Sequence, residues 1–193
     1  ACVALTRGAQ AAPRVTAKAA VVMDAKTGVI LWERDGDRPL PPASTTKVVA
    51  AILALESGRL RESMRVSQTA AGTPASKLYL RSGQRMRLED LVYAMLLNSA
   101  NDASVVVAEG LAGSQSSFGR QMTRRAHELG AEDSSFVNPH GLTAAGHVAS
   151  ASDLATVFRY ALGVPKFRNV LETQSIRVPI QSSRARSVTL RSH

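Results

Sequence analysis

Ser44 and Lys47 are the residues whose types and spacing best fit covalent catalysis. They stand three apart in Ser44-Thr45-Thr46-Lys47, at the predicted start of a helix, where residues three apart share a face. A serine hydroxyl is a weak nucleophile and needs a base within hydrogen-bond reach. A lysine can be that base if burial lowers its pKa, and the helix N-terminus offers N–H groups to charge developing at the serine. The alternative is that Ser44 simply caps the helix and Lys47 is solvated.

Ser99-Ala100-Asn101 lies between two predicted apolar helices, where a short loop could project it into a cleft. A second serine at this place could pass a proton between a lysine and a leaving amine, and the asparagine could hydrogen-bond the lysine or a substrate amide. The alternative is helix capping, because serine and asparagine suit a break between helices.

Lys26-Thr27-Gly28 has the composition of a carboxylate-binding strand edge, but its place between two short apolar runs favours a turn. Gly28 can take a positive φ, and Asp24 can bond the turn backbone. We therefore interpret the triplet as structural. No Lys-Thr-Gly or Lys-Ser-Gly triplet follows Asn101 in this sequence.

The order of predicted elements is strands, then several helices, then strands, which indicates an α+β fold rather than alternating strands and helices. The first and last hairpins could share one antiparallel sheet. Residues 59–87 read as turn-rich and 133–147 as a loop, and Ser150 with Asp153 forms a possible capping box. The expected elements are strands at 19–23 and 29–33, helices at 44–57, 88–96, 102–112, 118–129, 154–162 and 165–172, and a hairpin of 176–180 with 188–190.

The composition excludes several classes of function. The net charge is +9, but the basic residues are dispersed and not interleaved with aromatic residues, so we predict no nucleic-acid partner. No apolar run approaches the ~20 residues that cross a bilayer. The single cysteine, Cys2, allows no internal disulfide, and the four histidines show no metal-ligand spacing, so we expect neither a metal nor another cofactor.

Residues 1–12 are predicted to be the remnant of a signal peptide. Ala9-Gln10-Ala11 fits a small-residue cleavage site before Pro13. We therefore expect export to the periplasm or the outer face of the cytoplasmic membrane, and one catalytic domain over residues 13–193.

Five segments in order resemble the serine-type D-alanyl-D-alanine carboxypeptidases, which are low-molecular-mass penicillin-binding proteins. The resemblance implies a β-lactamase/DD-peptidase-like fold, with an antiparallel sheet flanked by helices and an all-helical lobe. It also implies that the C-terminal part of that sheet is missing from this chain. The segments are Asp24-Ala25-Lys26-Thr27-Gly28, Pro42-Ala43-Ser44-Thr45-Thr46-Lys47, Leu97-Asn98-Ser99-Ala100-Asn101-Asp102-Ala103, Phe136-Val137-Asn138-Pro139-His140-Gly141-Leu142 and Ser150-Ala151-Ser152-Asp153-Leu154.

The resemblance also implies roles for individual residues. Ser44 would attack the carbonyl between two D-alanines of a peptidoglycan stem peptide, Lys47 would accept its proton, Ser99 would protonate the leaving D-alanine and Asn101 would hold the site together. β-Lactam antibiotics would acylate Ser44 in the same way. His140 would lie near the rim of the site, as a substrate-binding or a structural residue.

The lysine of the family's third motif is not found in this chain, so the resemblance implies weak or no turnover by these 193 residues alone. It leaves open a membrane association through a later segment. Two alternatives remain: a D,D-endopeptidase of the same fold, and a non-catalytic module that binds peptidoglycan or penicillin. A β-lactamase is a lesser alternative, because no convincing loop for activating water follows Ser99.

Overall fold

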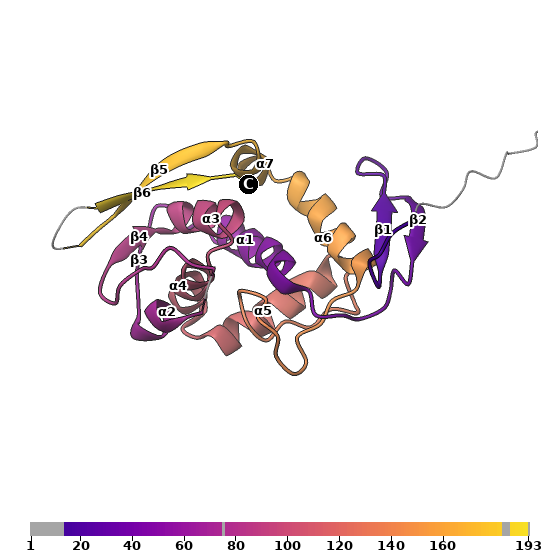
Figure 1. Ribbon diagram of the computed structural model, residues 1–193, viewed down its shortest axis with the longest axis horizontal. Coiled ribbons are helices and arrows are strands. Elements are labelled where there is room, and N and C mark those ends of the chain that lie inside the picture. The colour runs from indigo at the N-terminus through magenta and orange to yellow at the C-terminus, as the bar shows by residue number, and fades with distance from the viewer. Residues whose placement is uncertain (1–13, 75, 183–185, 193) are drawn as a thin grey trace, which may run out of the picture.

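The computed structural model describes residues 14–74, 76–182 and 186–192, so the predicted signal-peptide remnant lies outside the described residues. Helices fill the middle of the molecule, the first hairpin lies at one end, and the other strands lie at the opposite end (Figure 1). No helix among the described residues is long and apolar enough to cross a membrane.

The core is built around α1 (Thr46–Glu56), which packs against α3 (Leu88–Leu97), α4 (Asn101–Ala112) and α5 (Gln115–Glu128). The sequence of α1 is apolar on nearly every side, and such a helix must be surrounded by others. Its residues Val49, Ala50, Ala51, Ile52 and Ala54 are accordingly fully buried. Burial of this helix on most sides fixes the position of the chemistry-bearing residues at its N-terminus.

The helices α6 (Ala151–Leu162) and α7 (Pro165–Leu171) complete the helical part. The capping prediction for α6 is confirmed, since the Ser150 side chain accepts a hydrogen bond of 3.0 Å from the Asp153 N–H. The Asp153 carboxylate does not return the bond expected of a capping box and accepts one from Ser134 Oγ instead. It thereby ties the predicted loop of residues 133–147 to α6.

The strands form three antiparallel hairpins. They are β1 (Ala20–Met23) with β2 (Ile30–Arg34), β3 (Ser63–Arg65) with β4 (Arg85–Arg87), and β5 (Ser175–Ile180) with β6 (Arg186–Arg191).

The prediction that the first and last hairpins share a sheet is wrong for the described residues. The hairpin β1–β2 packs against α6, whereas β6 packs against α3, so helices separate the two hairpins (Figure 1). The antiparallel hairpins and helices together are an α+β fold, as predicted.

Residues 59–87, which read as turn-rich, contain three short elements that the sequence did not reveal. These are β3, β4 and the five-residue helix α2 (Gln68–Gly72). Three to five residues are too few to show a period of 2 or 3.6. These elements nevertheless matter for the site, because α2 and the loop that follows it lie against the start of α4.

Candidate active site

Ser44 lies in a single 3-10 turn, η1 (Ala43–Thr45), immediately before α1. Its side chain is exposed and makes no capping hydrogen bond to the helix backbone. The preceding residue, Ala43, has a φ of 48°, a conformation that costs energy for a residue other than glycine. The structure therefore does not support the simple capping interpretation of Ser44.

Lys47 lies in the first turn of α1 and is only 2% exposed. Its Nζ lies 3.1 Å from Ser44 Oγ, 3.2 Å from Ser99 Oγ and 2.8 Å from the backbone oxygen of His140. Burial lowers the pKa of Lys47 to about 8, because the charged form loses its hydration. A lysine with this pKa is a usable base near neutral pH.

Ser99 closes a triangle with these two side chains. Its hydroxyl donates to Ser44 Oγ at 2.8 Å, although 55 residues separate the two in sequence. Its φ is 50°, so the backbone turns sharply between α3 and α4. Ala100, and not Ser99 or Asn101, occupies the N-cap of α4, without a side-chain cap. The capping alternative for this segment is thus not observed either.

Asn101 is 4% exposed and fastens the loop after α2 to the start of α4. Its Nδ2 donates a hydrogen bond of 3.1 Å to the Pro74 backbone oxygen, and its backbone N–H donates one of 2.7 Å to the Ser76 backbone oxygen. The next residue, Asp102, is fully buried and accepts hydrogen bonds from the N–H groups of Leu78 and Leu80. Sequence reasoning missed Asp102, because its partners are more than 20 residues away.

His140 contributes to the site through its backbone. Its oxygen accepts the shortest hydrogen bond of Lys47, while its ring is buried and accepts a hydrogen bond at Nδ1 from the Leu142 N–H. Burial, and then the charge of Lys47, lowers the pKa of His140 to about 4, so the ring is neutral at ordinary pH. His140 thus lies beside the Ser44, Lys47 and Ser99 cluster, with its ring 8% exposed, and a substrate-binding role for the ring stays a prediction.

The loop that carries His140 lies tightly against Ala43, the residue before Ser44. Gly141 has a φ of 90°, and a Cβ at this position would lie 1.8 Å from the Ala43 backbone oxygen. Asn138 holds the loop in shape, because its Oδ1 accepts from the Gly141 N–H at 2.8 Å and its Nδ2 donates to the Leu142 oxygen. Only glycine fits at position 141, because any Cβ there would clash with the Ala43 backbone oxygen.

His147 joins the same loop to α1 and was also missed from the sequence. Its ring is 1% exposed, Nδ1 accepts from the Val137 N–H at 3.1 Å, and Nε2 lies 2.9 Å from Thr46 Oγ1. Because Nδ1 is an acceptor, the proton of the neutral ring is on Nε2 and is donated to Thr46. Burial lowers the pKa of His147, which favours this neutral form.

Lys26-Thr27-Gly28 forms a turn between β1 and β2, as predicted. Gly28 has a φ of 79°, and Asp24 Oδ1 accepts hydrogen bonds of 2.6 Å from both the N–H and the hydroxyl of Thr27. Arg159 of α6 holds the turn by donating to the oxygens of Ala25 and Lys26.

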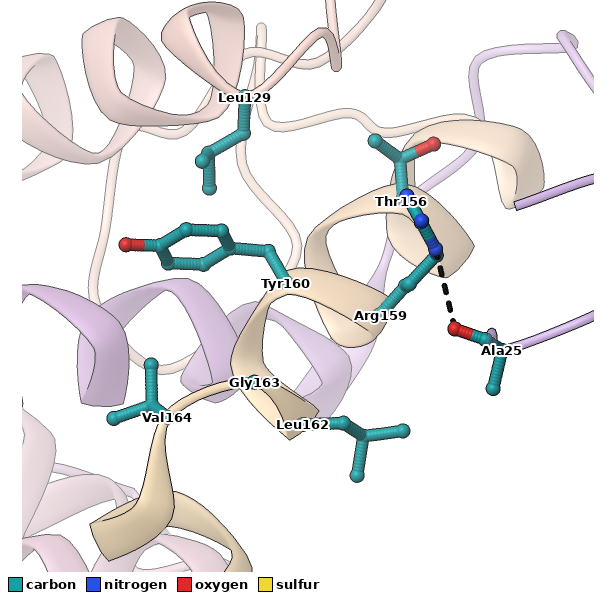
Figure 2. A pocket seen from close by; sticks show the side chains of 8 residues that line it. All are labelled: Ala25, Leu129, Thr156, Arg159, Tyr160, Leu162, Gly163 and Val164. Atoms are coloured by element: carbon teal, nitrogen blue, oxygen red, sulfur yellow. Dashed lines mark hydrogen bonds between the residues drawn. The ribbon is translucent and has the colours of Figure 1, made fainter. Parts of the chain in front are cut away.

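This turn borders a cavity of about 540 Å³ between β1–β2 and the helices, where Tyr160 and Leu129 also project (Figure 2). None of the residues that line it belongs to the Ser44, Lys47 and Ser99 cluster. Within the described ranges, no three His, Cys, Asp or Glu side chains are grouped as a metal ion would require.

This chain combines a serine, a buried lysine and a second serine at the start of its central helices. Solved structures of D-alanyl-D-alanine carboxypeptidases have the same fold as this chain. One from Mycobacterium tuberculosis has a TM-score of 0.84 at 27% identity, and covers 92% of this chain and 67% of its own. DacD from Francisella tularensis has a TM-score of 0.80 at 31% identity, over 86% of this chain and 41% of its own. The fold is therefore the DD-peptidase fold.

The sequence comparison defines the family more closely. The family model described as D-alanyl-D-alanine carboxypeptidase matches residues 6–183. The curated relatives include the carboxypeptidases DacF of Bacillus subtilis, 36% identical over 81% of this chain, and DacC of Escherichia coli, 36% identical over 75%. The chain belongs to the D-alanyl-D-alanine carboxypeptidase family. It spans 42% and 39% of the length of these two relatives.

Proposed function

We propose that this protein is a serine D,D-carboxypeptidase, which removes the terminal D-alanine of peptidoglycan stem peptides through an acyl-enzyme on Ser44. The observation that carries the proposal is the triangle of Ser44 Oγ, Lys47 Nζ and Ser99 Oγ, with separations of 2.8 to 3.2 Å around a buried amine. The names of the relatives supply the substrate class. The same nucleophile would be acylated by β-lactams, whose strained amide resembles the reacting bond.

The hydrogen bonds of Lys47 are consistent with its acting as the base. A neutral amine has two N–H donors and one lone pair. If the donors are used on the His140 oxygen and on Ser99 Oγ, the lone pair is directed at Ser44 and can accept its proton. The His140 oxygen thus supports the proposal that Lys47 is held as a base and not merely buried.

The steps follow from this geometry. As Ser44 Oγ bonds to the carbonyl carbon, its proton moves to Lys47 Nζ, and the oxyanion is stabilised by backbone N–H groups, including that of Ser44. Ser99 then passes a proton from Lys47 to the amine of the leaving D-alanine, and the C–N bond breaks. Water cleaves the Ser44 ester, which releases the shortened peptide and restores the enzyme. Asn101 and Asp102 keep the neighbouring loop in place.

A binding module without catalysis needs no activated serine, and burial of an unpaired lysine costs stability. The buried Lys47 beside Ser44 therefore favours an enzyme over such a module. The site gives no comparable reason to prefer an endopeptidase. We propose that the protein acts outside the cytoplasm, where peptidoglycan is found, in agreement with the predicted export signal.

Labelling with a fluorescent penicillin tests the assignment of the nucleophile. In the protein expressed from its complete gene, we expect the wild type to form a covalent adduct and Ser44→Ala to form none, because Ser99, the other hydroxyl beside Lys47, is less exposed than Ser44. The control is release of D-alanine from a D-Ala-D-Ala peptide, which should be lost in parallel. Equal labelling of the variant and the wild type would show that Ser44 is not the nucleophile.

The rate of acylation is expected to rise with pH and to level off above about pH 8. The neutral form of Lys47 is the base, and its pKa is lowered to about 8, so below this value the rate should fall about tenfold per pH unit. The pKa of His140 is about 4, so no inflection near the usual histidine value of 6.5 is expected from its ring. Stopped-flow acylation from pH 5 to 10 measures the profile. A rate independent of pH between 6 and 9 would contradict a lysine base.

A further inference from the structure

Two hairpins at one end of the molecule, β3–β4 and β5–β6, are joined by a bridge that aligns their outward faces. The register pairs Arg65 of β3 with Arg85 of β4, and a bridge pairs Arg85 with Gln181, which follows β5. The backbones of Arg85 and Gln181 exchange hydrogen bonds of 2.9 Å in both directions. Residues opposite each other in antiparallel strands project to the same side. The bond of 3.1 Å from Ser63 Oγ to Gln181 Oε1 agrees with this.

The register extends this face across β5 and β6. Arg177 is two pleats from Gln181 and pairs with Thr189, and Ser175 pairs with Arg191. Val178 and Leu190, which alternate with these residues along the strands, are buried against the core. Arg177, Thr189 and Arg191 therefore point outward. The face, here called the arginine face, consists of Ser63, Arg65, Arg85, Arg87, Ser175, Arg177, Pro179, Gln181, Ser187, Thr189 and Arg191.

The arginine face holds five arginines and no carboxylate. Arg65 and Arg85 are directly opposite each other, an arrangement of like charges that destabilises a strand pair. The ion pairs in the described part of the chain involve Arg59, Arg125 and Lys166, and none of the five. Arginines of this face donate hydrogen bonds to neutral groups instead: Arg177 donates to Ser187 Oγ, and Arg85 donates to the Ser63 backbone oxygen. The positive charge is therefore not balanced within the face.

Protection of sheet edges accounts for only part of this pattern. Charged residues on an edge strand prevent pairing with other molecules. The hairpins β3–β4 and β5–β6 are separate two-stranded sheets, which are joined at the bridge between Arg85 and Gln181. Arg85 is thus paired on both sides, with Arg65 and with Gln181, so protection of an edge does not explain its charge. A function that uses positive charge over the whole face does explain it.

We propose that the arginine face docks on an anionic phospholipid bilayer. The guanidinium group is planar and binds phosphate through two parallel hydrogen bonds. The five arginines are spread over four strands in two dimensions, so a planar array of phosphates can engage them together, whereas a linear polyanion follows a single line. Basic residues close to an anionic bilayer each strengthen binding about fivefold. The inference does not depend on the proposed function.

Vesicle sedimentation tests the proposal with the purified protein. We expect binding to vesicles of phosphatidylcholine with phosphatidylglycerol, and little binding to phosphatidylcholine alone. The variant Arg65→Gln/Arg85→Gln/Arg87→Gln should bind the anionic vesicles about 100-fold more weakly. The matched control is Arg34→Gln/Arg120→Gln/Arg124→Gln, which removes the same charge from β2 and α5, away from this face (Figure 1). Thermal unfolding of both variants confirms that they are folded.

The control variant should keep most of the binding, because charges on another surface are screened from the bilayer. Added salt should weaken the binding of the wild type, because it screens the attraction between the arginines and the lipid phosphates. Equal weakening in the two triple variants would overturn the proposal, since net charge alone would then be responsible. So would equal binding to uncharged vesicles. Binding of the wild type to soluble polyphosphate but not to anionic vesicles would instead assign the face to a linear polyanion and would also overturn it.

Discussion

Replacement of Lys47 by methionine is expected to lower the rate constant for acylation by a β-lactam about 10³- to 10⁴-fold. Methionine has a similar length and no charge, so the packing at the N-terminus of α1 is kept while the base is lost. Ser44 would still have Ser99 as a neighbour, at 2.8 Å, but Ser99 cannot accept a proton at neutral pH. Stopped-flow fluorescence of penicillin binding, with the protein expressed from its complete gene, measures this rate constant.

The matched control is Lys26→Met, in the Lys26-Thr27-Gly28 turn. Lys26 is exposed there, and its backbone oxygen, not its side chain, accepts the hydrogen bond from Arg159. Acylation by this variant should equal that of the wild type. Loss of acylation with Lys26→Met and retention with Lys47→Met would reverse the assignments of the two lysines. Circular dichroism and thermal unfolding separate either result from misfolding.

Gly141→Ala is expected to destabilise the protein by about 3 kcal/mol or more and to impair acylation as well. An alanine at a φ of 90° already costs about 1 kcal/mol. In addition, its Cβ would lie 1.8 Å from the Ala43 backbone oxygen, so the loop or the turn before Ser44 must move. That movement would shift the His140 oxygen away from Lys47. Urea unfolding gives the change in the free energy of unfolding, and penicillin labelling gives the change in acylation.

Gly146→Ala, in the same loop, is the control for this prediction. Gly146 has a φ of 75°, but a Cβ there would meet nothing closer than Val137 Cγ1 at 4.0 Å. The free energy of unfolding of this variant should fall only by the conformational cost of about 1 kcal/mol, and its acylation rate should not change. If the two variants were equally stable, the close contact between Gly141 and Ala43 would not matter for the fold.

The sequence predicted those parts of the structure that depend on near neighbours. The period of apolar residues placed the main helices within a few residues of their observed bounds, and the positive φ of Gly28 was expected from the turn. The three-residue spacing of Ser44 and Lys47 likewise predicted that their side chains meet, because the geometry of one helical turn is local. Short elements such as β3 and α2 were missed because they contain too few residues for a repeating pattern of apolar residues to show.

Only the tertiary structure decided which distant groups complete the site. Ser99 reaches Ser44 across 55 residues, His140 reaches Lys47 with its backbone oxygen, and His147 bonds Thr46 across 101 residues. It also decided that the first and last hairpins lie apart, and that dispersed arginines gather on one face through strand register. A periodic pattern shows which face of an element is buried, but not which distant element covers it. The sequence alone therefore indicated Ser44 as the candidate nucleophile and Lys47 as its candidate base, and the packing of α1 against the loop of residues 138–147 determined how Lys47 is held.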